Sequence, residues 1–320
     1  MRQQINLQQI SSHMTINEAF EQFIRVKKNQ NVSGETIIYY EGVKKGFTNF
    51  FSGENSCIDI TKRTIEDYTH FLKCKKPAIS SVTVNTNLRG LRAILYFFMA
   101  QGYLEEFKIS LIRQEKAVKR TYTEYELDAL LKKPNLKKCD FAEYRNWVIS
   151  NYLLATGNRL STVCNVKIRD INFKHHEILL TKLKNRRQYI IPLSSTLEKI
   201  LIDYLQYRKG EQDDYLFCTR YGDKLEKAAI VSAIKRYNRK RGVEKTSIHL
   251  YRHTFAKNWI LNGGDIARLK SILGHSSNDI VHEYLEMFGG DLQRNFDLYN
   301  PLDNIAATRA DGRKSIAMKK

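Results

Sequence analysis

Apolar residues at helical spacing run through most of this chain, and they constrain its fold more than any other feature. A capping box at Thr15 and Glu18 predicts where a first helix begins, and helical patterns follow at about 33–51, 64–73 and 82–101. This part of the chain therefore predicts a small all-helical domain.

The spacing of the apolar residues changes once, in the second half of the chain. A second capping box at Thr123 and Glu126 and a long apolar pattern from Phe141 predict further helices. EILLTK and YIIPL, separated by the polar KNRRQ, then predict two strands joined by a basic turn, and helical spacing returns at Leu197. We therefore expect a mainly α fold with a small antiparallel β-sheet.

Length and composition favour two domains. The 320 residues exceed the usual size of one hydrophobic core, and an apolar content of 42% is enough for two. The charged run RQEKAVKR separates the two helical patterns. We expect a flexible N-terminus at 1–13, a helical domain at 14–112, a linker at 113–120, a larger domain at 121–290 and a C-terminal segment and tail at 291–320.

The positive charge predicts a polyanionic partner. The formal net charge is +19, and Lys and Arg are scattered along the chain, which favours DNA or RNA over a basic surface that serves solubility alone. Between 230 and 241, the pattern is typical of a helix with an apolar inner side and a DNA-facing side, or of a solvated basic helix. Its apolar residues are Ile230, Val231, Ile234 and Tyr237, and its basic residues are Lys235, Arg236, Arg239, Lys240 and Arg241.

Several other classes of protein are disfavoured. The five cysteines are widely spaced and include no C-x-x-C pair, so we expect neither a zinc site nor a disulfide framework. The N-terminus lacks the apolar core of a signal peptide, and no stretch is long and apolar enough to cross a bilayer. We expect a cytoplasmic protein without a membrane partner.

Residues in the second half could carry phosphodiester chemistry. Cleavage without a metal needs a nucleophile, cations for the non-bridging oxygens and an acid for the leaving 5′-oxygen. Arg159, in TGNRLS, is predicted to project from a helix start, and His249 and Arg252, in HLYRH, share one helix face. His275, in LGHSS, and Tyr284, in VHEYLEM, follow. Taken singly, Arg159, His275 and Tyr284 are more typical of structural or surface residues, and the HLYRH motif is as typical of a structural pair as of a catalytic one.

The order and spacing of these motifs resemble the tyrosine recombinase (phage integrase) family. The resemblance runs from about Met14 to Phe288 and includes the N-terminal helical unit, which looks like the family's core-binding domain. It implies a two-domain clamp around double-stranded DNA and four protomers on two DNA sites. Accessory DNA-bending or directionality factors are further candidate partners, and no metal, ATP or other cofactor is expected. Apolar residues after Tyr284 could form a segment exchanged between protomers, or fold back on their own domain.

The resemblance assigns a role to each residue of the set. Arg159 and Arg252 would clamp the scissile phosphate, while His249 would hydrogen-bond it and assist proton transfer. His275 takes the third phosphate-contacting position. Tyr284 would be the nucleophile, and its attack would form a 3′-phosphotyrosine.

A lysine completes this set, and two residues depart from the family's pattern. Lys184, eight residues before Pro192, best matches the lysine that protonates the leaving 5′-hydroxyl, and Lys182 is the second choice. Thr162 stands where the family commonly has an acidic residue. Tyr251 replaces a usual leucine at a position expected to face the interior.

Two other functions are compatible with part of this residue set. A type IB topoisomerase-like enzyme would relax supercoiled DNA with the same residues but would exchange no strands between sites. A non-catalytic DNA-binding regulator on a decayed scaffold is disfavoured because the whole set is present. The sequence therefore predicts a site-specific DNA recombinase or integrase.

Overall fold

The computed structural model describes residues 14–114, 120–180 and 189–274. By its contacts the chain divides into two compact units, Met1–Ala117 and Val118–Lys320. The boundary between them falls inside the stretch 113–120 that the sequence analysis assigns to a linker.

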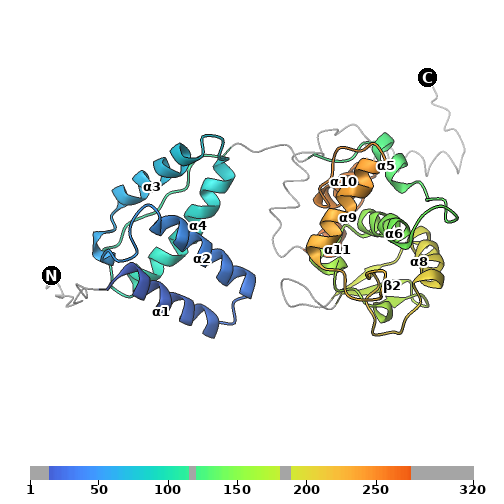
Figure 1. Ribbon diagram of the computed structural model, residues 1–320, viewed down its shortest axis with the longest axis horizontal. Coiled ribbons are helices and arrows are strands. Elements are labelled where there is room, and N and C mark those ends of the chain that lie inside the picture. Colours follow the sequence, from blue (N-terminus) through green and yellow to red (C-terminus); the bar gives the residue numbers. More distant parts are fainter. Residues whose placement is uncertain (1–13, 115–119, 181–188, 275–320) are drawn as a thin grey trace, which may run out of the picture. The chain divides into compact units, whose positions relative to one another are not determined.

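The first unit is helical in its described part. Its elements are α1 (Ile16–Asn29), α2 (Gly34–Thr48), the short 3₁₀ helix η1 (Cys57–Asp59), α3 (Lys62–Lys75) and α4 (Ser81–Ala100). Helix α4 contacts α1, α2 and α3, so the core of this unit forms around it (Figure 1). The largest buried side chains here include Phe23, Phe47, Tyr68 and Phe98.

Capping residues set the starts of these helices. The Glu18 N–H donates to Thr15 Oγ1 at 3.2 Å, and the Thr15 N–H donates to Glu18 Oε2 at 2.9 Å, which is the predicted capping box. Ser33 and Ser80 cap α2 and α4 through their hydroxyl oxygens. These bonds satisfy N–H groups that a helix start leaves unpaired, so the predicted helix starts near these residues are confirmed.

The second unit combines helices with one small sheet. Its elements are α5 (Glu124–Leu131), α6 (Phe141–Thr156), α7 (Leu160–Val163), η2 (Ile168–Asp170), β1 (Ile171–Asn172), β2 (Glu177–Leu180), β3 (Tyr189–Pro192), α8 (Ser195–Arg208), α9 (Lys227–Lys240), α10 (His249–Leu261) and α11 (Ile266–Leu273). The strands are antiparallel in the order β1-β2-β3, and Leu180 pairs with Tyr189. The predicted mainly α fold with a small antiparallel sheet is confirmed, although the sequence analysis missed the two-residue strand β1.

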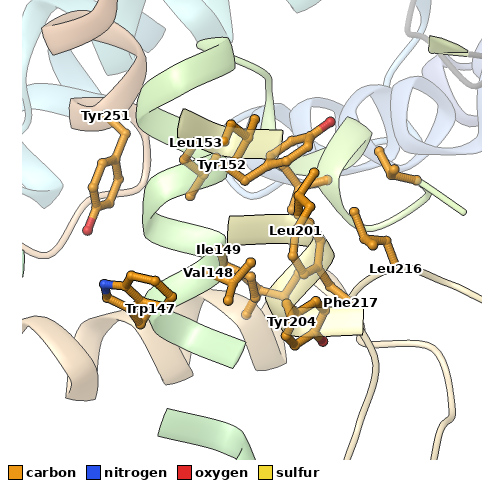
Figure 2. Close-up of a cluster of buried hydrophobic side chains, with 14 of the residues drawn as sticks. Trp147, Val148, Ile149, Tyr152, Leu153, Leu201, Tyr204, Leu216, Phe217 and Tyr251 are labelled. Carbon is orange, nitrogen blue, oxygen red and sulfur yellow. The ribbon is translucent and has the colours of Figure 1, made fainter. Parts of the chain in front are cut away.

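Helix α6 lies at the centre of the second unit, where it contacts α5, α8, α9 and α10 (Figure 1). Its residues are buried on all sides rather than along one stripe, which is typical of a helix inside a core. Figure 2 shows Trp147 to Ile149, Tyr152 and Leu153 of α6 among buried side chains of α8 and α10. Because α6 ends just before Arg159, this core fixes the segment that carries that residue.

The described ranges contain neither a membrane span nor a metal cluster. No helix in them has both the length and the apolar character needed to cross a bilayer. No three His, Cys, Asp or Glu side chains in them gather as metal ligands would. All five cysteines lie in these ranges, and all are free thiols.

Candidate active site

Arg159 lies directly before helix α7, as the sequence predicts. Helix α6 ends at Thr156 and is capped by Gly157, whose left-handed conformation (φ 60°) turns the chain sharply. A Cβ on Gly157 would lie 2.7 Å from side-chain atoms of both Leu273 and Phe255, so only glycine fits here without a shift. Asn158 is buried and donates to the Tyr152 hydroxyl at 3.1 Å, which anchors the residue next to Arg159.

Arg252 lies in the first turn of α10 and is buried, with 6% of its surface exposed. A buried cation is stable only when its N–H groups are hydrogen-bonded. Its Nη1 donates to the Gly157 carbonyl at 2.7 Å, and its Nη2 donates to the Leu273 carbonyl at 2.8 Å. These two bonds hold the guanidinium between the end of α6 and the end of α11.

The two arginines meet at the C-terminal end of α11. Arg159 Nη1 donates to the Leu273 and Gly274 carbonyls, each at 3.4 Å, and Arg252 donates to the same Leu273 carbonyl. The last carbonyls of a helix have no partner within the helix and carry partial negative charge, so they offset the repulsion between two neighbouring cations. The structure thus brings together two residues that are far apart in the sequence.

A tyrosine that the sequence analysis did not single out also reaches this helix end. The Tyr189 hydroxyl, from the first residue of β3, donates to the Ile272 carbonyl at 3.3 Å. Burial raises the pKa of Tyr189, while the charges of Arg252 and Arg159 act in the opposite direction, which indicates that the phenol lies in the field of both guanidiniums. Only the position of Tyr189 next to the predicted basic turn could have pointed to it.

His249 is the first residue of α10 and is exposed to solvent, one helical turn before Arg252. Residues three apart on a helix lie on neighbouring positions of its surface, so the imidazole and the guanidinium belong to one end of α10. The imidazole is on the outer side and the guanidinium on the inner side.

The other predicted site residues lie outside the described ranges. They are Lys182, Lys184, His275 and Tyr284. Two described residues at the end of α11 or bonded to it adjoin the segments that hold these residues. Gly274 directly precedes His275, and Tyr189, which pairs with Leu180, follows the segment with both lysines.

The two departures from the family's pattern have different structural settings. Tyr251 is fully buried, as predicted, and its hydroxyl donates to Ser150 Oγ at 3.0 Å. Thr162 is also buried, and its N–H donates to the Arg159 carbonyl in the turn of α7. The Arg159 guanidinium donates to the Leu273 and Gly274 carbonyls, so main-chain groups at the end of α11 take part in its orientation.

Helix α9 has the predicted buried side, but two residues were assigned to the wrong side. Ile230, Ile234 and Tyr237 are buried. Val231 is 43% exposed, because it is one residue away from the buried stripe at helical spacing. Arg241 is partly buried, with its guanidinium 4.5 Å from the centre of the Tyr237 ring and bonded to the carbonyls of α5 and its C-cap.

The remaining basic residues of α9 are exposed. Lys235, Arg236 and Arg239 face solvent, and Lys240 forms an ion pair with Glu143 at 2.6 Å. The outer side of α9 is therefore basic, although Arg241 bonds to main-chain carbonyls and Lys240 forms a surface ion pair.

The site has the composition of a phosphate-binding centre. Two planar guanidiniums from different elements converge at the Leu273 carbonyl, and the N–H fork of a guanidinium matches the oxygens of a phosphate. Such a pair, on a mainly helical scaffold with a basic surface, defines a class of protein that binds or processes nucleic-acid phosphates.

Comparison with known proteins identifies the family. The model of the phage integrase family matches residues 120–288, which is more than half of the chain. A tyrosine recombinase from Pseudothermotoga lettingae is 25% identical over 275 residues, which cover 85% of this chain and 93% of that protein. Tyrosine recombinase XerD from Staphylococcus epidermidis is 26% identical over 299 residues, which cover 90% and 99%. The chain belongs to the phage integrase family, the tyrosine-type site-specific DNA recombinases.

Solved structures agree on the fold. A lambda integrase dimer (residues 75–356) bound to a COC′ core site matches with a TM-score of 0.70 at 15% identity, covering 87% of this chain and 98% of that one. The Tn1549 transposon integrase in complex with transposon right end DNA matches with a TM-score of 0.67 at 18% identity, covering 88% and 99%. At these identities the likeness concerns the fold alone.

Proposed function

We propose that the protein cleaves and rejoins duplex DNA through a covalent bond between Tyr284 and a backbone phosphate. The observation that carries the proposal is the meeting of Arg159 and Arg252 at the Leu273 carbonyl. Two guanidiniums at one point suit a single phosphate group, whose non-bridging oxygens gain charge in the transition state. Membership of the phage integrase family supports the same reaction.

The proposed reaction exchanges one phosphate ester for another. The Tyr284 phenol oxygen attacks the phosphorus, the bond from phosphorus to the 5′-oxygen breaks, and a 3′-phosphotyrosine forms. The leaving 5′-oxygen takes a proton from Lys184, or from Lys182 as the second choice. Since the new ester keeps the free energy of the broken one, a 5′-hydroxyl of another strand can attack it and reseal the DNA without ATP.

The cations of the site have a second task in this scheme. A phenol has a reference pKa near about 10, so neighbouring positive charge must favour its attack near neutral pH. Arg159, Arg252 and the lysine supply that charge without a metal ion. His249 and His275 hydrogen-bond the phosphate, and His249 assists the proton transfer.

Double-stranded DNA is the proposed substrate, bound by both units. The net charge of +19 and the exposed cations of α9 favour contact with phosphates. A lambda integrase tetramer bound to a Holliday junction has a similar fold, with a TM-score of 0.67 at 14% identity. We extend this arrangement to the present chain as four protomers on two DNA sites, with accessory DNA-bending or directionality factors as further candidates.

A nicked suicide substrate tests the nucleophile. The substrate carries a candidate site taken from the DNA that flanks the gene, and covalent protein is separated from free protein by denaturing electrophoresis. Wild type should become linked to DNA, and Tyr284→Phe should bind the DNA but form no link. Tyr207→Phe, on the exposed surface of α8, is the matched control and should behave as wild type. Linkage of the Tyr284→Phe variant would overturn the assignment.

A modified leaving group tests the lysine. A 5′-bridging phosphorothiolate leaves without a proton, so it should restore cleavage to a variant that lacks only the general acid. Lys184→Ala should be rescued and Lys182→Ala should not. Rescue of Lys182→Ala alone would reverse the choice. Covalent attachment with supercoil relaxation, but without recombinants between two sites, would instead indicate a topoisomerase-like enzyme.

A further inference from the structure

The last three carbonyls of the α11 segment each accept a hydrogen bond from a different part of the second unit. The Ile272 carbonyl accepts from Tyr189 of β3, the Leu273 carbonyl from Arg252 of α10, and both Leu273 and Gly274 carbonyls from Arg159 before α7. The position of this helix end therefore decides where both guanidiniums point.

We propose that Tyr189 is a positioning residue for the arginine pair. Its hydroxyl holds the Ile272 carbonyl and thereby fixes the turn whose next two carbonyls orient Arg252 and Arg159. The inference rests on the proposed function, because that function is what assigns the arginines to the scissile phosphate. It gives Tyr189 a role that acts through the helix end and the arginines.

The helix end is shaped to receive this hydroxyl. Gly274 ends α11 in the left-handed conformation, with φ at 61°. A Cβ on Gly274 would lie 2.8 Å from the Tyr189 hydroxyl and 3.1 Å from two ring carbons, so any larger residue would press on the phenol. Glycine satisfies both the backbone conformation and this close approach.

The contact also differs from ordinary packing of an aromatic ring. Tyr189 is only partly buried, so its ring alone contributes less to the core than the fully buried tyrosines of this unit. Its hydroxyl bond crosses from the sheet to a helix more than eighty residues away in sequence, as the hydrogen bond to Ile272 shows. Removal of the hydroxyl should therefore change the orientation of the helix end more than the stability of the fold.

The experiment compares Tyr189→Phe with wild type and with the Tyr207→Phe control. Single-turnover formation of the covalent complex is measured on the nicked substrate, together with DNA affinity. Tyr189→Phe keeps the ring and should bind DNA within about twofold of wild type, because most contacts between the protein and DNA phosphates do not involve the arginine pair. Its covalent step should be about tenfold slower, because loss of one orienting hydrogen bond misplaces the cations.

A neutral scissile group separates positioning of the arginines from a general structural role. The same rates are measured with a methylphosphonate at the scissile position, in which a methyl group replaces one non-bridging oxygen and removes the negative charge. The arginines then have less charge to balance, so the defect of Tyr189→Phe should shrink to about twofold. A structural defect would be the same on both substrates.

The outcomes distinguish the two proposals. An unchanged covalent rate for Tyr189→Phe, or an equal defect on both substrates, overturns the positioning role while wild-type linkage leaves the proposed function standing. A wild type that forms no covalent complex overturns both. Tryptophan fluorescence checks the fold of each variant, since Trp147 and Trp259 both lie in the second unit.

Discussion

Replacement of Tyr251 by leucine, the usual residue of the family at this position, should destabilise the second unit by about 3 kcal/mol. The Tyr251 ring lies 4.8 Å from the Tyr122 ring, a contact of about 0.5–1.5 kcal/mol. Its hydroxyl bond to Ser150 contributes about 1 kcal/mol. The smaller leucine would leave a cavity at a fully buried site, which costs about 1–2 kcal/mol more.

Urea unfolding followed by tryptophan fluorescence measures this change. Both tryptophans of the chain, Trp147 and Trp259, lie in the second unit, so the signal reports that unit and not the helical first one. Tyr251→Phe keeps the ring and should cost only about 1 kcal/mol, the value of the hydroxyl bond. Tyr125→Leu, at a residue 84% exposed, is the control and should change the free energy of unfolding by less than about 0.5 kcal/mol.

The polar network around Tyr251 could also adjust to leucine. The Tyr251 hydroxyl also lies 3.4 Å from Asn238 Oδ1. Asn238 donates to the Tyr122 hydroxyl at 2.9 Å and to the Lys245 carbonyl at 2.8 Å, so it keeps these two bonds when the Tyr251 hydroxyl is lost. If the rest of the network adjusts around leucine, the free energy of unfolding should stay within about 1 kcal/mol of wild type. That result would refute the claim that this chain depends on tyrosine at position 251.

Three further outcomes follow from other parts of the molecule. Gly157→Ala should lower the free energy of unfolding by about 2 kcal/mol and should also slow DNA cleavage. The reason is that the new Cβ would press on Leu273 and Phe255 and displace the Gly157 carbonyl, which holds Arg252. Urea unfolding measures the first effect and the suicide substrate the second. The hydrogen bond from Lys133 lowers the pKa of Asp203 in the folded state. This carboxylate therefore stabilises the protein above its unfolded pKa near about 4, and the stabilisation is lost as the pH falls through the folded pKa. Asp203→Asn should flatten the acid side of a plot of urea midpoint against pH. The logarithm of DNA affinity should fall linearly with the logarithm of salt concentration, with a slope of about −0.9 for each phosphate neutralised, and titrations at several salt concentrations measure that slope.

Local chemistry explains why much of the fold could be predicted from the sequence. The capping boxes at Thr15 and Thr123 act within four residues, so their pattern alone locates the starts of α1 and α5. The strands β2 and β3 form where the apolar period changes, as expected. Strand β1 has two residues, too few to show any period, and its pairing of Ile171 with Ile178 is visible only in the folded unit.

The site was predictable only in part. Arg159 and Arg252 have recognisable motifs, and the structure brings them to the same carbonyl. Val231 was assigned to the buried side of α9 because an apolar residue next to a stripe looks like part of it, whereas one position on a helix turns the side chain by a large angle. Tyr189 had no motif at all, and only its long-range bond to Ile272 distinguishes it.

Main-chain carbonyls take part in orienting both arginines, and no residue pattern in the sequence reveals a carbonyl contact. Every residue type supplies a carbonyl, so the side chains at Ile272 and Leu273 can be chosen for packing while their oxygens hold the cations. What the site requires is a helix that ends at the right place, and Gly274 provides that end through a backbone conformation that other residues rarely adopt. The orientation of the arginine pair thus depends on the glycine that terminates α11 and on the tyrosine that holds this helix end.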